Sequence, residues 1–258
     1  MSTQDLHQIV RVRHELRRRS LVVSGVESVT PRMRRIHFAS PDLADFNSPS
    51  PDDHIKLFFP QAGEQVMRDF TPRAYDNRGQ TLTIDFALHG SGPATEWAAG
   101  AKVGSTLEIG GPKGSQLVPD DFDWYLLVGD ESALPALGRR VELLRPGVPV
   151  TTVAVVANAS EQQTFVTKAS WHPTWVVRGE PGPGDGALLL RELAKFTPPP
   201  GDGFVWLAGE AEWVRELRTY VIEERGQPAE WVKAASYWHR DGMTATQGLA
   251  VITVTGPG

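Results

Sequence analysis

Cysteine is absent from this chain of 258 residues, and that absence narrows the chemistry open to it. Neither disulfide bonds nor cysteine-ligated iron–sulfur clusters can form. The seven histidines show no H-E-x-x-H or comparable ligand spacing, so we expect no catalytic metal held by the protein itself. Any electron-transfer chemistry would therefore depend on an organic cofactor, or on a metal that arrives with other ligands.

Long apolar runs are also absent. No segment approaches the roughly 20 apolar residues of a membrane span, and the region after Met1 lacks the apolar core of a signal peptide. We therefore expect a cytoplasmic protein with no membrane partner. A chain of this length can bury a sizeable core, and nothing in it requires an oligomer, so we expect a monomer.

Negative charge is scarce at the start of the chain. The formal net charge is −5, yet the first 40 residues contain eight arginines against three acidic residues. Arg17, Arg18 and Arg19 flank an apolar strand pattern and lack the interleaved aromatic residues of a nucleic-acid stacking platform. We interpret them as a solvated tail and strand edge, without a nucleic-acid partner.

The first half of the chain contains short alternating runs that indicate β-strands. Residues 82–88 alternate between apolar and polar side chains, which predicts a half-buried strand. Similar runs at 33–38 and 55–59 are separated by glycine and proline. This spacing predicts an antiparallel β-barrel over residues 17–120, preceded by a flexible segment at residues 1–16.

In the second half, residues 121–258, strands alternate with helices. Helical patterns end near residue 144, cover 188–196 and extend over 211–225. The intervening apolar runs lie at 124–128, 150–156, 175–177, 204–208 and 231–237. This alternation predicts a parallel sheet covered by helices, so an α/β domain follows the β domain.

A short stretch of the predicted barrel combines three side chains that suit a flavin. Arg68 offers paired donors to phosphate oxygens, Phe70 offers a flat aromatic face, and Thr71 offers a hydroxyl to the edge of a planar ring. Each also has a plain structural interpretation. Arg68 could form a surface salt bridge, Phe70 could belong to the barrel core, and Thr71 could be an ordinary strand residue.

A glycine-rich turn follows the strand that ends at His89. Its residues open a helix whose backbone N–H groups suit a pyrophosphate, and we assign that role to Gly92, Ala94 and Thr95. His89 could contact a phosphate or adenine, or be a satisfied group at a strand end. The turn alone could be a simple helix start, but its combination with Arg68 favours cofactor binding.

The second domain lacks the common phosphate and nucleophile motifs, namely G-x-G-x-x-G, G-x-x-x-x-G-K-[ST] and G-x-S-x-G. Instead, Asp130, Glu131 and Ser132 follow an apolar strand, at the edge where open α/β sheets bind ligands. These residues could face a nucleotide. The two acids could equally be helix-start residues that complement the helix dipole.

Seven segments that include these residues resemble, in the same order, the siderophore-interacting proteins, a branch of the ferredoxin-reductase-like flavoproteins. The segments are 53–60, 68–73, 85–95, 110–115, 129–135, 209–211 and 237–240. Two departures stand out. Phe70 replaces the family's usual tyrosine, and His239 stands where a second arginine is common.

The resemblance implies specific roles for these residues. Arg68, Phe70, Thr71, His89 and the turn at 92–95 would bind FAD, with Thr71 near the reactive edge of the flavin. Asp130, Glu131 and Ser132 would face the nicotinamide, with Gly209 and Glu210 bordering the same cleft. The residues implied for the anionic ferric chelate are Lys56, His239 and Arg240, of which Lys56 and Arg240 would face the flavin.

Each of the chelate residues has a plainer interpretation. Lys56 could be a solvent-facing strand residue, Arg240 could cap a surface turn, and His239 could supply a pH-sensitive charge or nothing.

The implied activity is electron transfer from NADH or NADPH through FAD to iron(III) in a ferric siderophore, with release of iron(II). A ferredoxin is an alternative electron donor. Two rival functions stay open on the sequence: a general flavin or quinone reductase of the same two-domain design, and a siderophore-binding protein without turnover.

Overall fold

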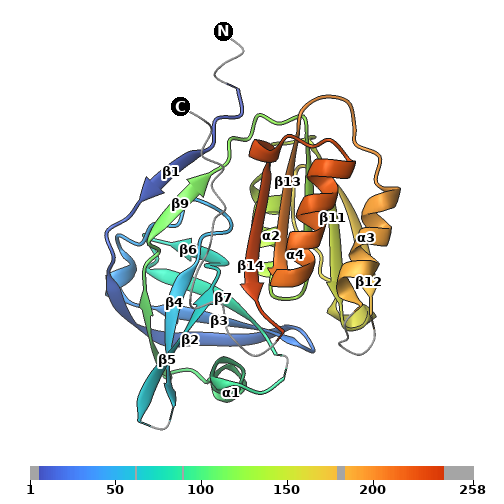
Figure 1. Ribbon diagram of the computed structural model, residues 1–258. Helices are drawn as coiled ribbons and strands as arrows, with labels where there is room; N and C mark the ends of the chain where they lie inside the picture. Colours follow the sequence, from blue (N-terminus) through green and yellow to red (C-terminus); the bar gives the residue numbers. More distant parts are fainter. Residues whose placement is uncertain (1–5, 62, 89, 179–183, 241–258) are drawn as a thin grey trace.

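The computed structural model describes residues 6–61, 63–88, 90–178 and 184–240. Two sheets account for most of it (Figure 1). The first contains β2 (Arg18–Thr30), β3 (Met33–Ala39), β4 (Ile55–Gln61), β5 (Glu64–Phe70), β6 (Ala74–Asp76), β7 (Thr81–Ala87) and β8 (Thr106–Gly110). The second contains β10 (Trp124–Gly129), β11 (Pro149–Val156), β12 (Ser170–Val177), β13 (Gly203–Glu210) and β14 (Val232–Trp238).

The first sheet is antiparallel, with strand order β5-β4-β8-β2-β3-β7-β6. Side chains from both ends of this order, such as Leu57 on β4 and Ile84 on β7, lie in one core and are fully buried. The sheet therefore curls around that core, as the alternating patterns predicted. Helix α1 (Pro93–Gly100) covers one opening and places Trp97 against the core.

The N-terminal arm differs from the flexible segment that the sequence predicted. Val10–Arg13 form strand β1, which pairs with β9 (Gly114–Leu117). Before it, His7 stacks on Phe122 with ring centroids 4.0 Å apart and lies between two carboxylates, 2.8 Å from Asp121 and 3.2 Å from Asp202. The partners of this arm are more than 100 residues away in the sequence, so no local pattern in residues 1–16 could indicate the pairing.

The second sheet is parallel, with strand order β12-β11-β10-β13-β14. All residues of β10 and β13 are buried, as expected for central strands covered on both faces. Helix α2 (Leu134–Leu143) packs on one face, and α3 (Asp185–Lys195) and α4 (Ala211–Thr219) pack on the other (Figure 1). The predicted succession of a β domain and an α/β domain is confirmed.

Helix α4 is shorter than the sequence predicted. The pattern indicated one helix over 211–225, whereas α4 ends at Thr219 and continues as a π-helical segment, Tyr220–Glu224.

Across the described ranges, no helix combines the length and apolar character that a membrane crossing needs.

A buried carboxylate joins the two halves of the molecule. The side chain of Asp52, just before β4, is 3% exposed. It accepts hydrogen bonds from Lys233 Nζ at 2.6 Å and Trp206 Nε1 at 3.0 Å, and lies 3.5 Å from Arg140 Nη2. Burial alone would raise the pKa of Asp52, but Lys233 and Arg140 outweigh it and hold that pKa well below its usual range.

Three further contacts cross the same interface. Glu161, 2% exposed, accepts from the hydroxyl of Thr30 at 2.5 Å and from Arg32 N, at the turn between β2 and β3. Met33 from that turn packs in the core beneath α2. On the other side, Arg139 of α2 donates to the Pro72 carbonyl at 2.9 Å. The interface therefore combines an apolar contact with buried polar contacts.

Replacement of Asp52 by asparagine should strongly destabilise the protein, because it leaves Lys233 and Arg140 buried without their anion. We expect a loss of about 3–5 kcal/mol in the free energy of unfolding, measured by urea denaturation at pH 7. Asp42 is exposed and only ten residues away, so Asp42→Asn is the matched control and should change stability by less than about 0.5 kcal/mol.

The same pair of variants tests the pKa of Asp52. A carboxyl whose pKa is lowered on folding stabilises the protein above its unfolded pKa of about 3.9 and loses that contribution as the pH falls through the folded pKa. The wild type should therefore lose stability more steeply than Asp52→Asn below about pH 4. If the free energy of unfolding fell equally steeply below pH 4 in both proteins, the lowered pKa of Asp52 would be contradicted.

Candidate functional site

Arg68 lies on β5 opposite Leu57 of β4. Its guanidinium is partly buried, and burial lowers its pKa. Within the described residues it has no carboxylate partner, and its one side-chain hydrogen bond goes to the carbonyl of Met67 at 2.8 Å. The surface salt bridge, which was the alternative interpretation of Arg68, is not formed among these residues, and most of the paired donors stay available to an anion.

Phe70 at the end of β5 belongs to an aromatic group that connects β5 to α1. Its ring centroid lies 4.6 Å from that of Phe86 on β7, and the Phe86 ring lies 5.9 Å from Trp97 on α1. Phe70 is only half-buried and packs on the edge of the barrel core. The ring therefore packs on protein while the residue keeps an exposed part, so the stacking and core interpretations are compatible.

The start of α1 has the backbone geometry of an anion-binding turn. Gly92, the N-cap, has φ +157° and ψ +163°, a conformation that residues other than glycine rarely adopt, and a Cβ there would meet nothing within 4 Å. No side chain caps this helix end. Ala94 packs partly on the barrel core, and Thr95 follows it in the first turn. His89 lies outside the described residues.

These observations fit a dinucleotide with a pyrophosphate. Arg68 supplies a partly desolvated cation without a protein anion, and the α1 turn supplies backbone donors beside open space. Phe70 and Trp97 connect the two through the aromatic group. The residues present would therefore hold FAD by its phosphates at α1 and Arg68, with its ring system toward Phe70.

Thr71, directly after β5, contacts the second domain. It is 7% exposed, and its hydroxyl forms a hydrogen bond with the phenol of Tyr237 on β14. Burial raises the pKa of Tyr237, and the bond from Thr71 opposes that rise. The hydroxyl predicted to lie at a flavin edge thus also joins the two domains.

At the carboxyl edge of the parallel sheet, the structure brings together four of the five residues predicted there. Asp130 is 2% exposed, and its carboxylate accepts from Ser132 N at 2.9 Å, from the Ser132 hydroxyl at 2.5 Å and from Glu210 N at 3.3 Å. Burial raises the pKa of Asp130, and the bonds from Ser132 and Trp238 oppose the rise. A Cβ on Gly209 would lie 2.4 Å from Asp130 Oδ2, so only glycine fits there.

Glu131, the fifth residue, points toward a separate ion-pair group. It accepts from Ala157 N at 2.7 Å and pairs with Arg178 at 2.8 Å. Arg178 also lies 3.4 Å from Asp185 at the start of α3, whose pKa burial raises to about 6 against the opposing charge of Arg178. Arg240 acts on the same Asp185, so the structure places it near this acidic group. His239 beside it is exposed.

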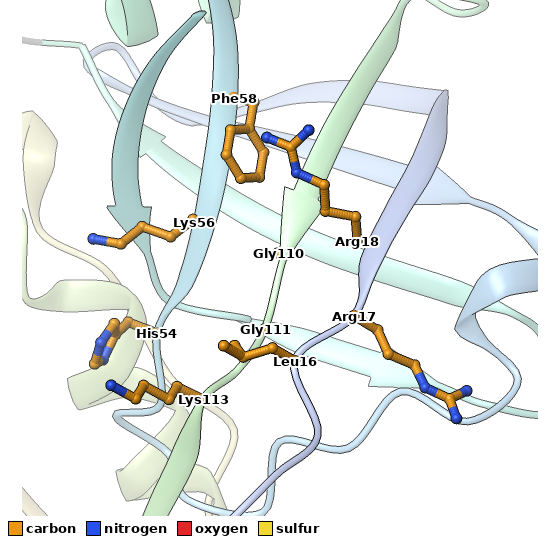
Figure 2. A pocket seen from close by; sticks show the side chains of 9 residues that line it. All are labelled: Leu16, Arg17, Arg18, His54, Lys56, Phe58, Gly110, Gly111 and Lys113. Atoms are coloured by element: carbon orange, nitrogen blue, oxygen red, sulfur yellow. The ribbon is translucent and has the colours of Figure 1, made fainter.

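Lys56 lines a groove on the barrel, which we call the basic groove, with a volume of about 340 Å³. Figure 2 shows His54, Lys56 and Lys113 extending to the same side of it, while Arg17 points the other way. The remaining lining residues are Leu16, Arg18, Phe58, Gly110 and Gly111.

Acidic residues neutralise part of the charge in the basic groove. Lys56 pairs with Asp69 at 2.6 Å, and Arg18 lies 3.5 Å from Glu108. Among the described residues, His54 and Lys113 form no side-chain ion pair. The resemblance implied that both Lys56 and Arg240 face the flavin. Lys56 lines the basic groove and pairs with Asp69, and the positive charge of Arg240 opposes the rise that burial causes in the pKa of Asp185.

Several site residues escaped the sequence analysis. Trp238 donates to Asp130 at 2.9 Å, yet the sequence marked it only as part of a resembling segment. Arg178 and its partner Glu131 are 47 residues apart, so local spacing gives no sign of the pair. His54 and Lys113 lie inside resembling segments, and their common orientation emerges only when β4 and the β8–β9 connection meet.

Comparison with known families agrees with this geometry. A model described as siderophore-interacting FAD-binding domain matches residues 22–67 and 64–116, and one described as siderophore-interacting protein matches residues 122–241. The chain belongs to the siderophore-interacting protein family. The two matches meet between β9 and β10, where the antiparallel half gives way to the parallel sheet.

Individual members of the family are similar over nearly the whole chain. The NADPH-dependent ferric-chelate reductase of Escherichia coli K12 is 35% identical, over 89% of this chain and 96% of the relative. The crystal structure of a siderophore utilization protein from T. fusca is 36% identical with a TM-score of 0.83, covering 90% and 97% of the two chains. The siderophore-interacting protein SipS from Aeromonas hydrophila is 31% identical with a TM-score of 0.76, covering 87% and 92%.

Replacing Gly92 by alanine should weaken FAD binding, because alanine in this backbone conformation costs about 1–3 kcal/mol and shifts the turn away from its anion-binding geometry. We expect at least a tenfold rise in the FAD dissociation constant, or about 1.4 kcal/mol, measured by quenching of flavin fluorescence with apoprotein. Gly100, at the other end of α1, has equal free space and no such constraint, so Gly100→Ala is the control. Equal affinity of the two variants would contradict the role of the turn.

Proposed function

We propose that this protein is a cytoplasmic flavoprotein reductase that passes electrons from NAD(P)H through FAD to iron(III) in ferric siderophores and releases iron(II). The observation that carries the proposal is the partly buried Arg68, which has no carboxylate partner among the described residues, together with an open glycine turn at α1, in a chain of this family. The relatives named as a ferric-chelate reductase and as a ferric vibriobactin reductase support the choice of acceptor.

Bound FAD would supply the redox chemistry, namely acceptance of a hydride (two electrons and one proton) from dihydronicotinamide and one-electron reduction of each of two ferric ions, with one proton released to solvent. The chain's own residues bind and orient the cofactor. Arg68 and the turn at Gly92, Ala94 and Thr95 hold the phosphates, Phe70 supports the ring system, and Thr71 lies at the domain junction. We assign residues 17–120 to FAD binding and 121–258 to the electron donor.

The chelate residues act by charge complementarity. Lys56 and Lys113 of the basic groove would attract an anionic chelate without an enclosing pocket. Siderophores bind iron(III) with hard oxygen ligands far better than iron(II), so reduction alone weakens the complex. Arg240, with His239, would approach the chelate from the second domain. We assign a monomer, and a ferredoxin as a second electron donor.

Replacing Arg68 by methionine should reduce retention of FAD, because a charge-assisted hydrogen bond of about 1.5–3 kcal/mol is lost while the side-chain length is kept. We expect the FAD dissociation constant to rise 10- to 100-fold and the purified protein to be largely colourless. Arg78→Met, at an exposed turn of the same domain, is the control. A fully yellow Arg68→Met protein would refute the role assigned to Arg68.

Replacing Lys56 by glutamine should impair reduction of the chelate and spare the flavin. The change removes a cation and leaves Asp69 unpaired, so we expect about a tenfold rise in KM for an anionic ferric siderophore, or roughly 1.4 kcal/mol. FAD content and reduction of an uncharged quinone should stay unchanged, and Lys102→Gln, at an exposed site, is the control.

The same assays separate the rival functions. A general quinone reductase would prefer the quinone and lose nothing with Lys56→Gln. A siderophore-binding protein without turnover would bind the chelate and form no iron(II) in the presence of NAD(P)H and an iron(II)-trapping dye.

A further inference from the structure

The parallel sheet has a topological switch point between β10 and β13. From β10 the chain proceeds to β11 on one side, and β13 and β14 lie on the other. Doubly wound sheets bind nucleotides at this point, with the pyrophosphate at the N-terminus of the helix after the first strand. The corresponding helix here is α2, and the turn that leads into it contains Asp130 and Glu131.

The backbone donors of this turn are already used or missing. Ser132 N donates to Asp130 Oδ1 at 2.9 Å, and Ala133 N donates to the Asp130 carbonyl at 3.0 Å. Pro135, at the second position of α2, has no N–H. The residues on either side of Pro135, Leu134 and Ala136, are each 1% exposed, so almost none of their surface is open to a phosphate.

The space at the switch point is also filled. Trp238 of β14 donates to Asp130 Oδ2 at 2.9 Å, across the end of β13. At Gly209, even a Cβ would lie 2.2 Å from the ring of Trp213 and 2.4 Å from Asp130 Oδ2. The chain's own side chains thus occupy the crevice that a pyrophosphate would need.

Beside the crevice, Glu131 adds a fixed negative charge. Its carboxylate is 13% exposed and is held by Ala157 N, at the end of β11, and by Arg178, at the end of β12. Arg178 thus pairs with Glu131 at 2.8 Å and lies 3.4 Å from Asp185, so it faces two carboxylates. Glu131 therefore repels a phosphate, and it also holds Nη2 of Arg178, a donor that a phosphate could otherwise use.

We propose that Asp130 and Glu131 exclude a dinucleotide pyrophosphate from the switch point, so that the electron donor is recognised by its dihydronicotinamide end. This inference rests on the proposed function for the presence of a nicotinamide donor. Asp130 fills the crevice and accepts hydrogen bonds from the backbone N–H groups of the turn. Glu131 provides the charge that determines specificity.

The test compares donors with and without phosphates on the FAD-loaded protein. Glu131→Gln removes the charge and releases Arg178 at constant shape. We expect it to tighten NADP⁺ binding at least tenfold by calorimetry, and to lower the NADPH concentration for half-maximal rate of flavin bleaching by a similar factor. Bleaching by 1-benzyl-1,4-dihydronicotinamide, which has no phosphate, should change less than twofold.

The control is Glu212→Gln, which removes the same charge from the exposed first turn of α4 at the same edge of the sheet. It should leave all three measurements unchanged, which excludes a general effect of net charge. Unchanged or weaker NADP⁺ binding by Glu131→Gln would overturn the proposal.

A second test uses only the wild-type protein, so it does not depend on the folding of a variant. Inorganic pyrophosphate at 10 mM should not compete with NADP⁺ for binding, and competitive displacement would overturn the proposal. Calorimetry with the oxidised nucleotide needs no turnover. A protein that binds NADP⁺ as expected and is never reduced by NADPH would therefore refute the proposed function, and leave the inference standing.

Discussion

The buried carboxylate of Asp52 is the contact on which the arrangement of the two domains depends. Two cations and an indole of the α/β domain surround it, at distances of 2.6 to 3.5 Å. A buried ion pair of this kind often contributes less net stability than an apolar contact of equal size, but removal of one partner leaves the opposite charge buried and is strongly destabilising. His54 and Lys56 of the basic groove follow Asp52 by two and four residues, so the groove begins directly after this contact in the sequence.

The stretch after β5 shows how far the flavin-binding motif depends on that interface. Thr71 bonds Tyr237, the Pro72 carbonyl accepts from Arg139, and Arg73 pairs with Glu142 at 2.6 Å. All three partners belong to the second domain. The local sequence of these residues resembles a cofactor-binding motif. Their positions are nevertheless fixed by side chains about 67 to 166 positions further along the chain. The proposed FAD site and the domain interface therefore share this stretch of the chain.

Local patterns predicted the fold well because each strand and helix is encoded by its own residues. The period-two run at 82–88 and the buried runs of β10 and β13 agree with the structure to within a few residues. What sequence could not supply were long-range partners. The β1–β9 pairing, Asp52 with Lys233, and Glu131 with Arg178 each depend on two segments that meet only after folding.

The two domains divide the binding of donor and acceptor unequally. The barrel offers an open, partly neutralised groove, whereas the switch point of the α/β sheet is filled by Asp130, Trp213 and Trp238. A donor held only by its nicotinamide end makes few contacts and dissociates quickly after hydride transfer, since residence time follows the contacts that must break. Two electrons arrive together but leave singly, to two ferric ions. A donor that departs at once leaves the flavin edge free for both acceptors, so weak donor binding favours this stoichiometry.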